Sequence, residues 1–468
     1  MKIAIILSVF SFLISMSTFA FFPTTDSLPT NFTAINIAQH GRIDLSNFES
    51  EFRKRGIEKI FVKSETGKIY SRYPVLLGIM SAPIFIGVNT LFGIHTISDI
   101  DLLNSRYVQT VGKINAAFYI GLSVALLYLI LQRFFPPSLS VAFTGIFYLA
   151  SPIFNTAAQG NWQHAMSVFF VLLGLLIYIH KPLSLKHLWI ASFIWGFAAS
   201  LRMSNGLYVV FPIIYLLSIH RCTWRHIALI MSAVFLGMSP HIITSVIHHI
   251  PSGYMYDLAR TQEVFSFKLI ALNAVSLFLS PNYGLLIYSP VFFTSFIGAW
   301  VGRRAPYIIA ASATIVCFTL LAATWWVWTG GAALDARMLT EAMPLFILTS
   351  GYGLQKLWKL RTVPQLILRP LIIAAILWGV FTHMLTVYAL DLSWNDKYLI
   401  YGYKNQLRNA WYTQPTLLEY TWNMRDFRLV YMFRSGNEIK TRTINYTISL
   451  KHGIVKRSDA TIAEFTIE

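Results

Sequence analysis

The sequence predicts an all-α, polytopic membrane protein, and three observations lead to this fold class. Apolar residues make up 55% of the 468 residues and charged residues only 12%, whereas about a quarter of a soluble chain is charged. Aromatic residues reach 15%. Apolar runs near twenty residues, the length of helix that crosses a bilayer, recur along the chain. A water-soluble fold of this size could not bury so much apolar surface.

We expect about eleven transmembrane helices, one for each apolar run. They lie at about 3–22, 114–131, 138–155, 165–180, 188–201, 206–220, 226–247, 284–301, 306–325, 340–355 and 370–391. The run 74–94 is apolar too, but Pro74, Pro83 and three glycines interrupt it. We interpret it as a helix at the membrane interface, within the first outer loop.

The distribution of basic residues predicts the orientation of these helices. With the N-terminus in the cytoplasm, the inner segments contain no Asp or Glu. Their twelve basic residues are Lys2, Arg133, Lys181, Lys186, Arg221, Arg225, Arg303, Arg304, Lys356, Lys359, Arg361 and Arg369. This bias follows the positive-inside rule and places the C-terminus outside. It also accounts for part of the net charge of +17 without nucleic acid as a partner. If 74–94 crossed the membrane, the basic loops would face outward.

Two local features have simple interpretations. Residues 1–20 allow a cleaved signal peptide, but the apolar run is longer than a usual signal core and favours an uncleaved anchor. Cys222 and Cys317 both lie in or beside apolar segments and cannot form a metal site by themselves. We interpret them as inert packing residues.

The predicted outer face contains two large segments. The first outer loop covers 23–113 and belongs to a membrane-embedded domain, 1–391. The tail 392–468 forms a separate extracytoplasmic region, where 443–450 alternates apolar and polar residues with the period of a strand. We therefore expect a small, partly β region at the C-terminus. No nucleotide-binding or hydrolase motif is present in the sequence.

Polar residues gather at the predicted outer ends of the helices, where charged groups are costly unless they pair or act. Each has a structural interpretation: Asp26 as a turn acid, Arg72 as a snorkelling anchor, His164 as an interfacial residue, and the tryptophans around Trp326 as an aromatic belt. Together they place carboxylates, arginines and aromatic rings on one membrane face. The candidate residues are Asp26, Asp44, Arg72, Tyr73, His164, Arg202, Tyr288, Trp326, Arg337 and Glu341.

This inventory suits a lipid-phosphate-linked sugar. Arginine binds phosphate oxygens in a bidentate manner, and aromatic rings can stack on a sugar face. A carboxylate can accept the proton of an acceptor hydroxyl.

The order of these features resembles the GT-C superfamily of polytopic glycosyltransferases, in the bacterial branch related to protein mannosyltransferases and lipid A aminoarabinose transferases. The matching elements extend to about residue 345, with a further piece in the tail. They include Thr25-Asp26-Ser27 with Pro29, Gly41 to Leu45, Tyr73-Pro74, Gln163-His164, Arg202, Ser280 to Pro290, and Trp326 to Pro344, with Leu417 to Asp426 in the tail. Two departures stand out: Asp335-Ala336 replaces the Gly-Pro common in relatives, and Asn31 stands where relatives often have a basic residue.

The resemblance implies an inverting transferase of the bacterial plasma membrane whose active site faces the periplasm or exterior. Asp26 is then the general base, and Arg72, Arg202 and Arg337 bind the donor phosphate. Asp44, Tyr73, His164, Tyr288, Trp326 and Glu341 are expected to contact substrate. The donor is a polyprenyl-phosphate sugar, and the acceptor a glycan, lipid or protein.

Other interpretations stay open at this stage. A transporter or flippase would need polar groups on both membrane faces and often has inverted repeats. This sequence shows no such repeat, and its polar residues gather at one predicted face. A glycan polymerase or ligase would share the chemistry and differ only in its acceptor. No cofactor is predicted with certainty, no residues are assigned to a metal, and a requirement for a divalent cation is left open.

Overall fold

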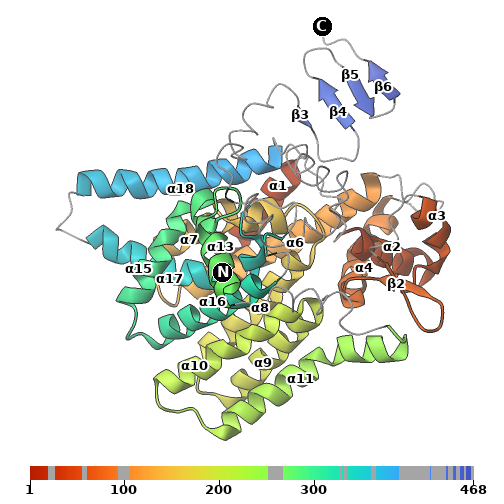
Figure 1. Cartoon of the computed structure of the whole chain (residues 1–468). Coiled ribbons are helices and arrows are strands. Elements are labelled where there is room, and N and C mark those ends of the chain that lie inside the picture. The colour runs from red at the N-terminus through yellow and green to blue at the C-terminus, as the bar shows by residue number, and fades with distance from the viewer. Residues whose placement is uncertain are drawn as a thin grey trace. The chain divides into compact units, whose positions relative to one another are not determined.

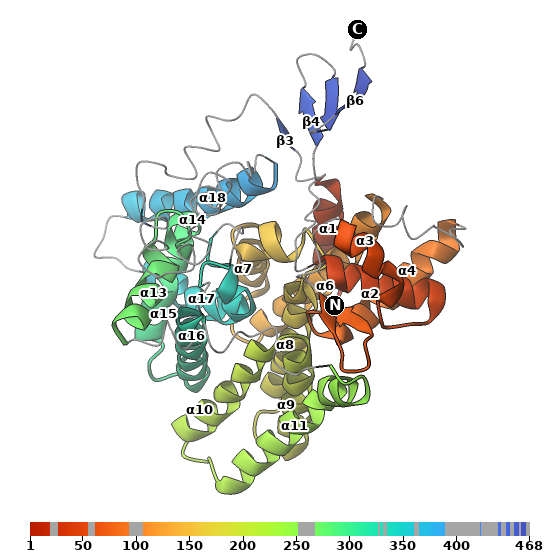
Figure 2. The same ribbon diagram turned by 45° about the vertical axis from the view of Figure 1, so that its right-hand side comes forward.

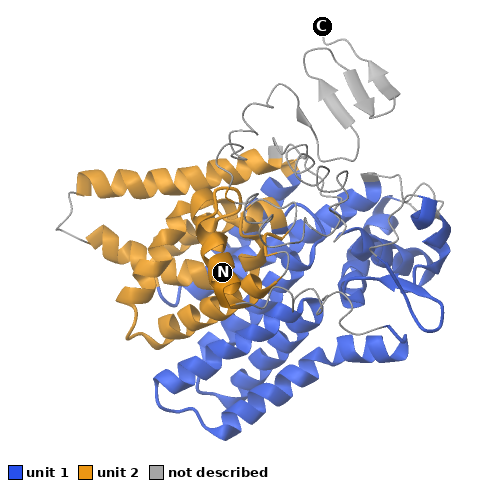
Figure 3. Cartoon of the chain, viewed as in Figure 1, with its two compact units in different colours: residues 1–16, 21–134, 157–257 blue, residues 17–20, 135–156, 258–468 orange. Residues whose placement is uncertain are grey.

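Figure 1 shows a computed structural model of the chain, which is built mainly from helices. The structure describes residues 1–18, 27–54, 61–92, 106–250, 267–325, 328–330, 335–359 and 365–388, together with Trp422 and four short strands of the tail. Two compact units divide the chain (Figure 3). Unit 1 comprises 1–16, 21–134 and 157–257, and unit 2 comprises 17–20, 135–156 and 258–468. The domain boundary expected at residue 391 stays a prediction.

Among the described residues, six helices are long and apolar enough to cross a membrane, and several shorter apolar helices accompany them. The six long helices are α4 (Val75–Phe92), α6 (Arg106–Leu131), α8 (Gln163–His180), α11 (Trp224–Ile247), α16 (Pro306–Thr324) and α18 (Gln365–Tyr388). The prediction of a helical, multi-pass membrane protein is confirmed. The count of eleven spans and their orientation stay predictions.

Helix α4 differs from the interrupted segment that its prolines and glycines suggested. It is one continuous helix, and Pro83 lies inside it. Its mean hydropathy is 2.0, and its length would allow it to span a bilayer. Its place at the membrane interface therefore remains a prediction based on the distribution of basic residues.

Unit 1 is a helical bundle joined to a small folded loop region. Its remaining elements are α1 (Lys2–Ser17), α2 (Leu28–His40), η1 (Ser46–Phe48), α3 (Glu49–Lys54), β1 (Phe61–Lys63), β2 (Ile69–Ser71), α9 (Leu185–Leu201), the 3-10 helix η4 (Met203–Val209) and α10 (Val210–Ser218). Helix α9 packs between α8 and α11, as Figures 1 and 2 both show. Helices α6 and α8 also pack together, and α2 lies on α4.

The segment predicted to be the first outer loop has a hydrophobic core of its own. Phe32 of α2 packs against Phe48 and Phe52, with ring centroids 5.9 and 5.4 Å apart. Phe61 of the β1–β2 hairpin stacks on Phe52 at 3.8 Å. These aromatic contacts make a packed region out of a segment that separates α1 from the bundle helix α6. Residues within it can therefore hold fixed positions.

Unit 2 contains the remaining helices. They are α7 (Pro137–Leu149), the π-helical turn η3 (Ile153–Ala157), α13 (Phe267–Leu279), α14 (Leu285–Tyr288), η5 (Pro290–Phe292), α15 (Phe293–Val301), η6 (Arg337–Ala342) and α17 (Met343–Lys359). Helix α13 falls between the expected spans 226–247 and 284–301, where we predicted no helix. It is a 13-residue apolar helix that packs on α16, so the apolar run 267–279 was missed because it is short.

The span expected at 284–301 is not one helix. It consists of α14, η5 and α15, with the break at Ser289 and Pro290. Proline has no backbone N–H, and its ring clashes with the carbonyl of the preceding turn, so a helix is interrupted there. The backbone around this break needs hydrogen-bond partners from elsewhere, because hydrocarbon supplies none.

The tail carries the strands that its alternating pattern predicted. Strands β3 (Ile439–Lys440), β4 (Tyr446–Ser449), β5 (Ile454–Arg457) and β6 (Ala460–Glu464) form an antiparallel sheet in the order β3-β4-β5-β6. Tyr446 pairs with Arg457 in the β4–β5 ladder, and the β5–β6 ladder has an irregularity at Val455 and Lys456.

Glycines set the closest helix contacts in both units. A Cβ atom on Gly298 of α15 would lie 1.7 Å from the Thr349 carbonyl oxygen of α17, and one on Gly353 would lie 2.0 Å from the Thr294 oxygen. In unit 1, Gly196 of α9 and Gly237 of α11 make the same kind of contact. Small residues let helix backbones approach closely in membranes, where packing drives association.

Replacing Gly298 by alanine should destabilise unit 2. The new methyl group must push α15 from α17, and such overpacking costs about 2 kcal/mol. Gly145→Ala in α7 is the matched control, because no atom lies within 4 Å of its Cβ position. Thermal unfolding in detergent measures the effect. Equal unfolding temperatures for the two variants would contradict the predicted contact.

Candidate functional sites

A buried amide network fixes the start of α2 in unit 1. The side-chain amide of Asn161 donates to Asn31 Oδ1 at 2.9 Å and lies 3.0 Å from Ser81 Oγ. Asn115 Nδ2 donates to Asn161 Oδ1 at 2.8 Å. All four side chains are buried. They join α2, α4, α6 and the segment before α8, so the chain that follows Asp26 is attached to the bundle by polar contacts.

Asn31 also accounts for a glycine. A Cβ atom on Gly112 of α6 would lie 2.6 Å from Asn31 Oδ1, so α6 must approach α2 closely at this point. Asn31, which stands where the resemblance leads us to expect a basic residue, is thus an amide packed against the backbone of α6 at Gly112. Its polar atoms are used within the protein.

Asp44 is held at the end of the turn that follows α2. Arg42 Nη2 donates to Asp44 Oδ1 at 2.8 Å, and Arg42 Nε donates to Oδ2 at 3.1 Å. Burial favours the neutral form of the carboxyl group, but the hydrogen bonds from Arg42 and Ser46 outweigh it and hold the pKa of Asp44 below its usual value. Asp44 is therefore ionised at neutral pH and bonded to its own loop.

The lowered pKa predicts a pH-dependent contribution to stability. Because the carboxylate is favoured in the folded state, its contribution is complete above the usual Asp pKa of about 3.9 and disappears as pH falls through the lower, folded value. Asp44→Asn should therefore unfold at a lower temperature than the wild type at pH 7. The difference should shrink below about pH 4. A difference that stays constant or grows on acidification would contradict this assignment.

Tyr73 and Arg72 lie between β2 and α4. The backbone N–H of Tyr73 donates to Ser71 Oγ at 3.0 Å, and both side chains are half-buried. Their neighbour Tyr70 is buried, with its hydroxyl 3.2 Å from His248 Nδ1 at the end of α11. The hairpin thus attaches to the bundle next to Arg72.

Two of the predicted site residues in unit 1, His164 and Arg202, are in direct contact. Arg202 Nη1 lies 3.0 Å from His164 Nε2 and 3.1 Å from Nδ1, while Arg202 Nε donates to Ser204 Oγ at 3.0 Å. A neutral imidazole has one acceptor nitrogen, so one of the two ring contacts is the hydrogen bond. Arg202 is 8% exposed and His164 is 1% exposed. A buried guanidinium thus lies beside the first turn of α8, where the helix dipole favours anions.

The loop that contains Arg337 in unit 2 is sharply turned. Gly330 has φ +74° and Asp335 has φ +60°. The Arg337 N–H donates to the Asp335 carbonyl at 2.9 Å, and the 3-10 helix η6 begins there. Glu341, at its other end, is fully buried, as is Asp335.

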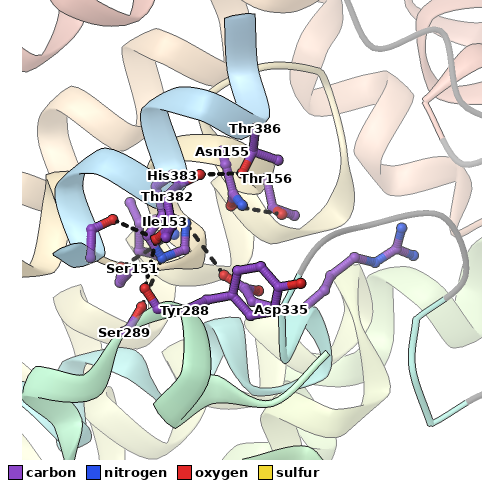
Figure 4. A network of polar contacts seen from close by, with 12 residues as sticks. Ser151, Ile153, Asn155, Thr156, Tyr288, Ser289, Asp335, Thr382, His383 and Thr386 are labelled. Atoms are coloured by element: carbon purple, nitrogen blue, oxygen red, sulfur yellow. Dashed lines mark hydrogen bonds and ion pairs between the residues drawn. The ribbon is translucent and has the colours of Figure 1, made fainter. Parts of the chain in front are cut away.

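Figure 4 shows a polar network around His383 of α18. His383 Nε2 lies 2.7 Å from Ser289 Oγ, and Nδ1 lies 3.4 Å from Asp335 Oδ2. The distance to Asp335 is longer than a hydrogen bond, so the imidazole is hydrogen-bonded to Ser289 and lies in close contact with the carboxylate. All three side chains are buried.

Helix α18 also supplies partners for the broken helix. Trp378 Nε1 donates to the Ile287 carbonyl at 2.8 Å, and Thr382 Oγ1 donates to the Tyr288 carbonyl at 2.7 Å. These two side chains satisfy the last carbonyl groups before the break, which helps to explain how a non-helical turn is tolerated inside an apolar unit.

The predicted site residues fall into three groups. Asp26 and Trp326 lie outside the described residues. In unit 1, His164 and Arg202 are in contact, while Asp44 binds Arg42 of its own loop. In unit 2, the described residues are Tyr288, Arg337 and Glu341, and the Tyr288 hydroxyl donates to the Asn282 carbonyl at 3.2 Å. Their roles at a substrate stay predictions.

The analysis of the sequence missed His383, Ser289 and the amide network. A single histidine in an apolar run gives no signal of its own, because its partners lie 48 and 94 residues away by sequence number. Lys113, only 1% exposed in α6, was missed because it directly precedes the expected span. Within the part of the chain that is described, no group of three or more His, Cys, Asp or Glu residues could hold a metal ion.

No family model matches the chain, and no curated protein matches it. Among solved structures, the chain is similar to ArnT from Cupriavidus metallidurans bound to undecaprenyl phosphate, with 13% sequence identity and a TM-score of 0.49. The match covers 82% of this chain and 75% of that chain.

Proposed function

We propose that the protein is an inverting glycosyltransferase that moves a sugar from a polyprenyl-phosphate donor to an acceptor hydroxyl on the extracytoplasmic face of the bacterial plasma membrane. The observation that carries the proposal is the buried pair His164–Arg202 at the first turn of α8. A guanidinium is costly near hydrocarbon and is kept there where it pairs or acts. Its planar donors fit phosphate oxygens.

In this mechanism the acceptor oxygen attacks the anomeric carbon of the sugar. The bond between that carbon and the phosphate oxygen breaks, and polyprenyl phosphate leaves with the bonding electrons. Asp26 takes the proton of the acceptor hydroxyl, and Arg72, Arg202 and Arg337 stabilise the charge on the leaving phosphate. Electrostatic stabilisation of a departing group is usually the largest catalytic contribution.

The packed first outer loop supports a role for Asp26 as the base. Asp26 directly precedes Ser27, the N-cap of α2, and the amide network holds the first turn of α2 through Asn31. A base must stay within hydrogen-bond reach of the proton that it removes. The aromatic core and the amide network together hold α2, which begins two residues after Asp26 in the sequence.

Mass spectrometry of surface glycans and glycolipids in a deletion strain tests the function. In the deletion strain, we expect one glycan or glycolipid to be lighter by the mass of a single sugar, because the unmodified acceptor accumulates. The wild-type gene should restore the normal mass. Unchanged glycans, together with an altered distribution of a lipid-linked substrate between the two leaflets, would instead support the flippase alternative.

A further inference from the structure

Asp335 is a strained residue next to a candidate phosphate ligand. Its φ of +60° lies in the left-handed region, and its side chain is fully buried. Residues other than glycine keep this conformation only where their surroundings enforce it, and such residues gather at functional sites. Two residues later comes Arg337.

The backbone and side chain of Arg337 both depend on this turn. Its N–H donates to the Asp335 carbonyl at 2.9 Å. Its side chain crosses Gly330, since a Cβ atom there would lie 3.4 Å from Arg337 Cβ and 3.4 Å from Nε. A change in the Asp335 turn would therefore change the direction in which the Arg337 side chain points.

One contact of Asp335 from outside its own loop comes from α18. His383 Nδ1 lies 3.4 Å from Asp335 Oδ2, and its other nitrogen lies 2.7 Å from the Ser289 hydroxyl. Ser289 is fixed in turn, because its N–H donates to the Leu285 carbonyl at 2.7 Å. Three elements of unit 2 thus meet at one imidazole, as Figure 4 shows.

We propose that His383 is a positioning residue for Arg337: through Asp335 it holds the turn that directs the guanidinium toward an anionic ligand. The ligand class rests on the function proposed above, namely the phosphate of a polyprenyl donor. His383 itself touches no substrate. Ser289 bonds Nε2 and thereby fixes the ring of His383 with Nδ1 facing Asp335.

The same three residue types form the catalytic triad of serine hydrolases, which makes a rival interpretation necessary. In such enzymes the serine hydroxyl must reach a substrate carbonyl. Here the Ser289 side chain is fully buried at a helix break, and its neighbours Ile287 and Tyr288 are bonded to α18. The geometry therefore favours a fixed support over a nucleophile.

The test measures binding of undecaprenyl phosphate to the purified, full-length protein in nanodiscs. Loss of the hydrogen bonds from Arg337 to the phosphate predicts that Arg337→Ala weakens binding by roughly tenfold or more. His383→Ala should weaken binding too, because the Asp335 turn that carries Arg337 loses its contact with the imidazole. Because both changes act on one guanidinium, the double variant should bind no more weakly than Arg337→Ala alone. Thr386→Val in α18 is the matched control, because Thr386 bonds only within its own helix in the contacts seen here.

Conservative variants identify the contact that matters. The amide of His383→Asn can occupy the place of Nδ1 and should restore binding to near the wild-type affinity. His383→Gln places its amide near Nε2 and should not. Equal rescue by both variants, or wild-type binding by His383→Ala when Arg337→Ala is impaired, would overturn the positioning role and leave the proposed function intact.

Hydrogen exchange keeps the inference testable without a ligand. His383→Ala should speed amide exchange in the peptide that covers 336–342, while Thr386→Val should not. Unchanged exchange would overturn the inference. Failure of the wild-type protein to bind undecaprenyl phosphate, with faster exchange in His383→Ala, would instead contradict the proposed function alone. Labelling of Ser289 by a fluorophosphonate would overturn the inference in favour of the hydrolase interpretation.

Discussion

Asp26→Asn should reduce sugar transfer by at least about a hundredfold while leaving the protein in the membrane at its normal amount. General-base assistance contributes on the order of 10²–10⁴-fold, and an amide cannot accept the proton of the acceptor hydroxyl. Binding of undecaprenyl phosphate should change little, because the carboxylate acts on the acceptor. The effect should therefore appear in kcat rather than in donor affinity.

Glu49→Gln is the matched control for this substitution. It makes the same exchange of carboxylate for amide in the same loop, and Glu49 bonds Arg53 at 2.7 Å on the surface of α3. Its activity should equal that of the wild type. Full transfer by Asp26→Asn, measured on protein of equal amount and equal unfolding temperature, would rule out Asp26 as the base.

Arg202→Gln should lower transfer by about 10²- to 10³-fold, the range seen when a donor to a developing negative charge is removed. It should also weaken binding of undecaprenyl phosphate. Arg202→Lys should recover only part of this loss, since an ammonium keeps the charge but not the planar fork of donors. The comparison separates a simple charge effect from bidentate recognition.

Arg133 provides an unusually close control for Arg202. Arg133 Nη2 lies 2.9 Å from His180 Nδ1, so it forms an arginine–histidine pair with α8 at the opposite end of the helix. Arg133→Gln should leave both binding and transfer unchanged. If Arg133→Gln and Arg202→Gln were equally impaired, the loss would reflect stability of α8, and Arg202 would have no special role at a phosphate.

Hydropathy predicted much of this fold, because long apolar segments are stable only where lipid or other helices cover them. The long apolar helices, the β-strands of the tail and the helical membrane class all follow from patterns of local sequence. The broken helix at Ser289 and Pro290 was missed because hydropathy does not register where a backbone hydrogen bond goes. Helix α13 was missed because 13 residues fall short of a span.

The candidate site could be predicted only where a residue is unusual by itself. Arg202 and His164 were recognisable because charged or polar residues at the end of an apolar run are rare. The amide network and His383 are different, since their meaning depends on partners far away in the chain. Asn161 becomes informative only once Asn31, Ser81 and Asn115 are seen around it.

The hydrogen bonds between α18 and the broken helix also bear on how the chain is assembled during synthesis. The carbonyls of Ile287 and Tyr288 leave the ribosome 91 and 94 residues before the donors on Trp378 and Thr382. Until α18 has been translated and inserted, these oxygens depend on water or on other temporary partners. Unit 2 therefore completes its folding late, and a chain truncated before residue 378 would lack the donors that let its proline break enter the membrane.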